Sequence, residues 1–269
     1  MTAFARRVAA LTGLADARIE RLAGGDLSEV LLVRRADGRL SVAKGGASVA
    51  AEASMLRAIA AAEVPAPLVE GELDGVLLLG FVDNDRLFTA SAWSGLGEAL
   101  RRLHSRRDER FGWPVDYRIG TVELDNRQGS DWPGFWAEQR LISTASVLDR
   151  PWRERVHRLA ARLPELVPQM PVAAFLHGDL WTGNILVRDG RLESLIDPAC
   201  YHGDAEVDLA MLTLFDVPPE PFWEAYGPLE PGWRERQPLY QLFPALVHLR
   251  LFGTSYAGMV DRLLRAVGG

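Results

Sequence analysis

Cysteine is almost absent from this sequence, since Cys200 is the single one among 269 residues. A disulfide framework within the chain is therefore impossible, and a zinc site built from cysteine thiolates is not expected. Scarce cysteine fits a reducing environment, so we expect the protein to be cytoplasmic.

Long apolar runs are also lacking. The longest strongly apolar stretch, residues 75–82, is far too short to span a bilayer. The apolar run that follows Arg6 and Arg7 is soon broken by Gly13 and Asp16, which makes the N-terminal segment a poor signal peptide. We therefore expect no association with a membrane.

The chain has no excess of basic charge. Its 30 basic and 36 acidic residues give a net charge of −6, which argues against a general nucleic-acid binder. Internal repeats and low-complexity tails are missing too. At 48% hydrophobic residues, the composition allows a sizeable core in one large domain or two modest lobes.

The first eighty residues carry strand patterns around one central helix. A helix is also predicted at the N-terminus, over residues 1–21. The order strand, strand, helix, strand, strand predicts a small antiparallel sheet lobe over residues 1–82. Its strands are predicted at 30–33, 40–43, 68–72 and 76–81, and its helix at 49–62.

From residue 83 onward, helical spacing dominates, apart from a short β island in the segment 175–187. We therefore expect a larger, mainly helical C-terminal lobe over residues 83–269, and an α+β fold for the whole chain. The proline-rich stretch 218–238 is predicted as irregular loop with at most short helical turns. The helices are predicted at 93–104, 135–148, 153–163, 206–215 and 241–267.

The most informative segment, residues 175–187, places Asp179 and Asn184 five positions apart between apolar runs. The catalytic loop of a phosphoryl-transfer kinase needs this spacing, because the Asp accepts the proton of the attacking hydroxyl and the Asn holds magnesium. Asp197 follows thirteen positions after Asn184, at the end of a second apolar strand. We predict Asp179 as the catalytic base, and Asn184 and Asp197 as ligands of Mg²⁺.

Two residues of the first lobe complete the pattern. Lys44 ends a predicted strand, and Glu52 lies eight positions later in the following helix. Kinases use such a lysine on the phosphates of ATP and such a glutamate to position it. We therefore predict Lys44 and Glu52 as part of the nucleotide site.

The remaining nucleotide contacts are predicted from backbone geometry. Gly24, Gly25 and Ser28 precede the first predicted strand of the sheet, and a glycine-rich turn there can offer backbone N–H groups to phosphates. This turn matches neither the G-x-G-x-x-G nor the Walker pattern. Residues Gly80, Phe81 and Val82 end the small lobe and are predicted to meet the adenine edge as a hinge.

Several residues near the catalytic segment have supporting roles. His177 is predicted to hold the loop, and Asp208 to brace it by hydrogen bonds. His104 ends an amphipathic helix and is predicted as a core or capping residue. Trp181 could stack on a sugar or cover an amine, or it could pack within the loop.

These residues resemble the fructosamine/ketosamine-3-kinase family, a branch of the aminoglycoside-phosphotransferase and choline-kinase-like group. The motif at residues 177–184, His-Gly-Asp-Leu-Trp-Thr-Gly-Asn, looks like the family's signature, tryptophan included. The similarity covers nearly the full length. Further matching stretches are 111–112, 119–120, 131–132, 135–141, 197–211, 240–243 and 251–256.

The resemblance implies a protein-kinase-like, two-lobed fold and ATP with Mg²⁺ as cofactors. It implies phosphorylation of a sugar hydroxyl on a glycated amine, in deglycation-type repair or catabolism. The expected partner is this small molecule, and the protein is expected to be a monomer or weak homodimer. Three alternatives stay open: a kinase for an aminoglycoside or choline-like amine, a nucleotide-binding pseudokinase, and, more remotely, a metal-dependent hydrolase.

Overall fold

The computed structural model describes residues 2–12, 18–22 and 29–268. The predicted phosphate-binding turn, with Gly24, Gly25 and Ser28, lies outside the described residues. Among those that are described, no helix is long and apolar enough to cross a membrane.

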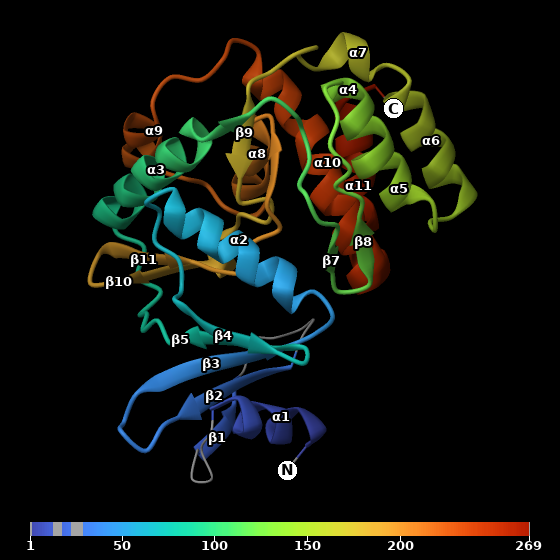
Figure 1. Cartoon of the computed structure of the whole chain (residues 1–269). Helices are drawn as coiled ribbons and strands as arrows, with labels where there is room; N and C mark the ends of the chain where they lie inside the picture. The colour runs from blue at the N-terminus through green and yellow to red at the C-terminus, as the bar shows by residue number, and fades with distance from the viewer. Residues whose placement is uncertain (1, 13–17, 23–28, 269) are drawn as a thin grey trace.

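The N-terminal lobe is a five-stranded antiparallel sheet with the strand order β1-β2-β3-β5-β4 (Figure 1). A two-residue turn joins β4 to β5, where Asp74 and Gly75 have φ of 49° and 75°. Positive φ at both positions matches the twist of a tight hairpin. The strands are β1 Arg18–Arg21, β2 Val30–Arg34, β3 Leu40–Gly45, β4 Val69–Leu73 and β5 Val76–Gly80.

The predicted N-terminal helix over residues 1–21 is wrong in its second half. Helix α1 covers only Ala3–Thr12, and Arg18–Arg21 forms strand β1. This strand pairs with β2 in register Ile19 to Val33. It thereby covers a sheet edge whose backbone groups would otherwise lack strand partners.

Helices cover both faces of the sheet (Figure 1). On one face, Phe4 and Val8 of α1 pack with Leu78 of β5. On the other, helix α2, Val49–Ala61, packs Leu56 against Leu77. Because neighbouring residues of a strand point to opposite faces, this double cover explains why the sequence of β5 is apolar throughout.

Helix α2 also connects the sheet to the second lobe. Its residues Met55 and Ile59 belong to a core cluster that contains Leu96 and Leu100 of helix α3, Ala90–Ser105. The cluster continues to Leu180 in the catalytic segment. The position of α2 is therefore set from both lobes at once.

The C-terminal lobe is mainly helical, with short strands between the helices. Its longer helices after α3 are α6 Arg150–Ala160, α8 Glu206–Phe215, α9 Glu220–Tyr226, α10 Trp233–Phe252 and α11 Ala257–Ala266. Short helices are α4 Trp132–Phe135, α5 Ser143–Ala145 and α7 Leu163–Leu166, and a π-helical stretch covers Trp136–Ile142. The strands are β6 Arg107–Asp108, β7 Tyr117–Ile119, β8 Val122–Leu124, β9 Ala173–Leu176, β10 Ile185–Arg188, β11 Arg191–Leu195 and β12 Tyr201–Gly203.

Two predictions near the C-terminus differ from the structure. The stretch 218–238, predicted as loop, contains α9 and the start of α10. Pro221 lies in the first turn of α9, where its fixed φ suits a helix and its missing N–H is not needed. The stretch 241–267, predicted as helical, is divided between two helices, because Gly253 with φ of 79° ends α10 before α11 begins.

Candidate active site

The catalytic segment is held by buried β structure on both sides. Strand β9 is buried throughout and leads into residues 177–184. A 3₁₀ turn at Thr182–Asn184 then starts the β10–β11 hairpin, which returns the chain to Asp197. The N–H of Ile196 donates to the carbonyl of Asn184 at 3.0 Å. Backbone pairing therefore places Asn184 beside the residue that precedes Asp197.

Asn184 contacts the predicted base directly. Its side-chain nitrogen donates to the backbone carbonyl of Asp179 at 2.9 Å and to a carboxylate oxygen of Asp179 at 3.1 Å. These bonds use the amide nitrogen and leave the side-chain carbonyl as the group that could bind a metal ion. Burial, together with the negative charge of Asp197, raises the pKa of Asp179 to about 7.

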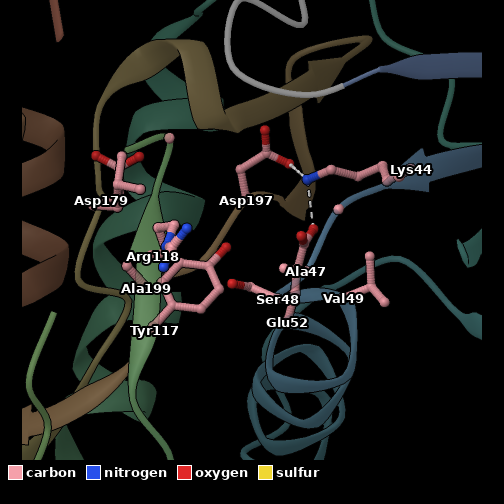
Figure 2. Close-up of a pocket in the computed structure, with 14 residues that line it drawn as sticks. Lys44, Ala47, Ser48, Val49, Glu52, Tyr117, Arg118, Asp179, Asp197 and Ala199 are labelled. Carbon is pink, nitrogen blue, oxygen red and sulfur yellow. Dashed lines mark hydrogen bonds and ion pairs between the residues drawn. The ribbon is translucent and has the colours of Figure 1, made fainter. Parts of the chain in front are cut away.

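Lys44 links the two lobes. Its ammonium lies 2.5 Å from Oε1 of Glu52 and 2.8 Å from Oδ1 of Asp197, a residue 153 positions away in sequence (Figure 2). Burial alone would lower the pKa of Lys44, but the two carboxylates outweigh it and the pKa is raised. The amine therefore stays charged. Lys44 is also the only lysine in the sequence.

Asp197 has an unusual backbone conformation. Its φ of 54° is in the left-handed region, which non-glycine residues rarely adopt and which is frequent at functional sites. One carboxylate oxygen contacts Lys44, while the side chain remains 48% exposed. The second oxygen is therefore accessible to a ligand in the cavity.

These side chains surround one cavity of about 260 Å³ between the lobes (Figure 2). Lys44, Glu52, Asp179 and Asp197 line it, as the sequence pattern predicts. Trp181, Asn184 and the hinge residues 80–82 do not belong to its lining. The remaining lining residues are Gly45, Gly46, Ala47, Ser48, Val49, Tyr117, Arg118, Ile119, Gly120 and Ala199.

The β7–β8 hairpin, which was not predicted from the sequence, supplies Tyr117 and Arg118 to the cavity wall. Burial raises the pKa of the Tyr117 hydroxyl well above its usual value, and the charges of Glu52 and Asp197 add to this effect. The hydroxyl is therefore a neutral hydrogen-bonding group. The available signal was two short runs, Tyr117–Ile119 and Val122–Leu124, separated by a turn with Gly120.

The predicted hinge lies where the chain leaves the sheet. Gly80 pairs with Ser41 at the end of β5, and the N–H of Phe81 donates to the carbonyl of Leu40 at 3.3 Å. Residues 80–82 are half-buried. Their contact with adenine stays a prediction.

A buried carboxylate anchors the start of the catalytic segment. Asp208, fully buried near the start of α8, accepts from the N–H groups of His177 at 2.7 Å and Gly178 at 2.8 Å. It also lies 3.0 Å from Nε2 of His104, which is buried. Burial acts to raise the pKa of Asp208, but His104 and the amides outweigh it and the pKa is lowered. Asp208 thus stays ionised and fixes the loop, as proposed from the sequence.

The buried histidines should make stability depend on pH. Burial lowers the pKa of His177 and also of His248. As pH falls below about 6.5, the unfolded chain binds protons at these histidines that the folded chain does not, so the histidines lower the free energy of unfolding. Asp179, whose pKa is raised to about 7, takes up a proton in the folded chain over the same range and opposes them. Chemical denaturation at pH 7.5 and 5.5 measures this change.

A matched pair of variants locates the effect. On going from pH 7.5 to 5.5, the change in the free energy of unfolding should be more positive in His177→Asn than in the wild type, whereas His157→Gln, on the exposed face of α6, should leave this change as in the wild type. A pH-dependent change that is the same in His177→Asn as in the wild type would contradict the assignment of His177 as a neutral buried histidine.

The indole of Trp181 packs against the backbone of Gly183. A Cβ added to Gly183 would lie 2.2 Å from carbons of the Trp181 ring, so the ring lies against the bare backbone there. Arg86 donates to the carbonyl of Gly183 at 3.0 Å. Trp181 remains 40% exposed and contacts Phe215 edge-on at 6.3 Å. Packing therefore explains why a tryptophan at 181 and a glycine at 183 occur together in the motif at residues 177–184.

The chain is similar to known kinases in sequence and in fold. The chain matches the fructosamine kinase family over residues 3–267. A probable ketoamine kinase of Lactiplantibacillus plantarum is 36% identical over 218 residues, which are 76% of each chain. The crystal structure of a Thermobifida fusca protein named as a candidate fructosamine-3-kinase has a TM-score of 0.86 at 34% identity, over 98% of both chains. An amicoumacin kinase solved with AMP-PNP and Ca²⁺ shares the fold at TM-score 0.62 and 16% identity, over 93% of this chain and 87% of that one.

The fold and these matches define a phosphotransferase of the protein-kinase-like class, with two lobes and an α+β architecture. Within that class, the chain belongs to the fructosamine kinase family. The resemblance found from the sequence motifs is thereby confirmed.

Proposed function

We propose that this protein transfers the γ-phosphate of ATP to a sugar hydroxyl of a ketosamine, the product of sugar addition to an amine. The observation that carries the proposal is Lys44 of the sheet lobe, which bridges Glu52 and Asp197 in the cavity that Asp179 also lines. Family membership supports the acceptor class. Phosphorylation of such an adduct fits a role in deglycation-type repair or catabolism.

Asp179 is the proposed base. In the reaction, an oxygen–phosphorus bond forms to the acceptor hydroxyl, the bond to the leaving ADP breaks, and the hydroxyl proton passes to Asp179. A carboxyl whose pKa is raised to about 7 accepts a proton more readily than an ordinary aspartate. Hydrogen bonds from Asn184 fix its orientation.

The residues of the cavity fit a divalent cation. The described lining contains three carboxylates, those of Glu52, Asp179 and Asp197. It contains only two basic side chains, Lys44 and Arg118. ATP would add more negative charge. We propose that Asn184 and Asp197 hold Mg²⁺ through hard oxygen donors, which Mg²⁺ prefers. When bound, the ion neutralises charge on the phosphates.

The rest of the nucleotide is proposed to lie between a lobe of residues 1–82 and a lobe of residues 83–269. Lys44, positioned by Glu52, would contact the phosphates, together with the backbone around Gly24, Gly25 and Ser28. The adenine would meet the backbone of residues 80–82 in the hinge. Trp181 is proposed as a wall for the acceptor.

A substrate panel tests the proposal. Purified protein is given ATP, Mg²⁺ and, separately, ketosamines of several sugars, free sugars, an aminoglycoside and choline, and ADP formation is measured. The expected result is turnover that is fastest with a ketosamine. Faster turnover of the aminoglycoside or choline would move the assignment to another hydroxylated amine. Thermal stabilisation by ATP without turnover of any acceptor would indicate a non-catalytic nucleotide binder.

Displacing Trp181 should weaken acceptor binding selectively. In Gly183→Ala the new Cβ collides with the indole, so the ring must leave its place. We expect the KM for the acceptor to rise about tenfold, the cost of losing one aromatic contact of about 1.4 kcal/mol. The KM for ATP should change less than twofold, because the ring does not line the cavity of Lys44 and Asp197.

Steady-state kinetics with each substrate varied in turn measures this difference. Gly129→Ala is the matched control, since no atom lies within 4 Å of the added Cβ. An unchanged KM for the acceptor in Gly183→Ala would exclude Trp181 as part of the acceptor site.

A further inference from the structure

The exposed aromatic side chains of this protein are concentrated at one place. Among the described residues, which include every Phe, Trp and Tyr of the chain, only three such side chains are more than about a third exposed. They are Trp181 at 40%, Phe215 at 36% and Phe252 at 43%. Isolated exposed apolar residues are ordinary, but a grouping of all exposed aromatics indicates a binding surface.

The three side chains belong to one chain of ring contacts. Phe215 contacts Trp181 at 6.3 Å on one side and His248 at 5.0 Å on the other. His248 contacts Phe252 at 5.5 Å and Tyr256 at 5.0 Å. We call these five residues the aromatic path.

The path is attached firmly to the catalytic segment. Asp216, next to Phe215 at the end of α8, accepts hydrogen bonds from the hydroxyl of Thr182 at 2.9 Å and from its N–H at 3.2 Å. His248 is fixed as well, because its Nδ1 donates to the carbonyl of Pro244 at 2.8 Å. Trp181 follows Asp179 by two residues, so the path starts within the catalytic segment that carries the proposed base.

The geometry of an acceptor suggests what occupies this path. A ketosamine has a sugar part, which must reach Asp179, and a substituent on its amine, which must extend away from the cavity. Three ring-to-ring steps of 5.0–6.3 Å lead from Trp181 to Phe252. A flat or aliphatic substituent can lie along such rings, and the protonated amine is attracted to the face of an indole.

We propose that the aromatic path binds an apolar or aromatic substituent on the acceptor's amine and so sets which ketosamines are preferred. This inference rests on the proposed function. Phe215, His248, Phe252 and Tyr256 would then determine specificity without touching the reacting atoms.

The test compares two acceptors made from the same sugar, the ketosamine of methylamine and the ketosamine of phenylbutylamine. The ratio of their kcat/KM values is measured for the wild type, Phe252→Ala and Tyr256→Ala. Because both acceptors meet the same protein sample, partial unfolding cancels in the ratio. Met170→Ala, a change at an 84% exposed side chain outside the path, is the control.

The wild type should prefer the phenylbutylamine adduct, and Phe252→Ala should reduce this preference about tenfold, which is the loss of one aromatic contact. Met170→Ala should keep the wild-type ratio. A ratio unchanged in both path variants would overturn the inference while the proposed function stands. Light scattering gives a second way to overturn the inference. If Phe252→Ala abolishes a dimer and leaves the ratio unchanged, a second copy of the chain covers the path, and the proposed function still stands. Failure of both acceptors in the wild type, with turnover of another amine, would reject the proposed function and this inference together.

Discussion

Asp179→Asn is expected to lower kcat about a thousandfold, within the range contributed by a positioned general base. Asparagine keeps the size of the side chain and can accept the hydrogen bond from Asn184, but it cannot take the hydroxyl proton. The KM for ATP should stay close to the wild-type value, because the proposed nucleotide contacts are made by other residues. Steady-state kinetics with ATP and the preferred ketosamine measures both constants.

Asp189→Asn serves as the control for this change, since Asp189 is an exposed aspartate in the turn after β10. It should leave kcat within about twofold, as surface substitutions usually do. If Asp179→Asn kept more than a tenth of the wild-type kcat, another group would have to receive the proton, and the assignment of the base would be wrong.

Lys44→Met is expected to reduce both activity and stability. The variant loses the cation proposed to contact the phosphates, so kcat/KM for ATP should fall about a hundredfold or more. It also leaves Glu52 buried without its partner, and removal of one member of a buried pair costs about 3 kcal/mol. Burial raises the pKa of Glu52, so the carboxyl will tend to take up a proton in this variant. Kinetics and chemical denaturation measure the two effects.

A double variant separates these two effects. Adding Glu52→Gln to Lys44→Met removes the unpaired buried charge, so stability should partly return, whereas activity should not. Recovery of activity in the double variant would show that Lys44 acts only on stability.

The lone lysine provides an independent check. An amine-selective reagent can modify only Lys44 and the α-amino group, because the sequence has no other lysine. ATP should slow modification of Lys44, as followed by peptide mass analysis. Equal rates with and without ATP would place the nucleotide elsewhere.

In the N-terminal lobe, the elements with local sequence signals could be predicted and the element without them could not. The hairpins β2–β3 and β4–β5 were predictable because turn residues such as Asp74 and Gly75 act within a few positions. Strand β1 was not, because its four residues adopt that form only by pairing with β2. The intrinsic preferences of four residues do not indicate which strand they will pair with.

In the cavity, too, some residues are placed by local structure and others only by tertiary packing. The relative positions of Asn184 and Asp197 follow from a short hairpin, and their spacing in the sequence already implied it. Tyr117 and Arg118 enter the site because packing brings the β7–β8 hairpin there, and nothing in their own segment indicates the cavity. The aromatic path likewise joins residues of the catalytic segment, α8 and α10 that no local pattern connects.

The sequence by itself determined the family, the α+β class and the residue types that carry the chemistry, because these depend on motifs whose members lie within about twenty positions of one another. Only the tertiary structure decided that Lys44 reaches Asp197 across 153 positions, and that Tyr117 and Arg118 share their cavity. The physical reason is that contacts between distant segments arise from how helix α2 and the sheet pack on the second lobe. That packing is a property of the whole core, and no single segment encodes it.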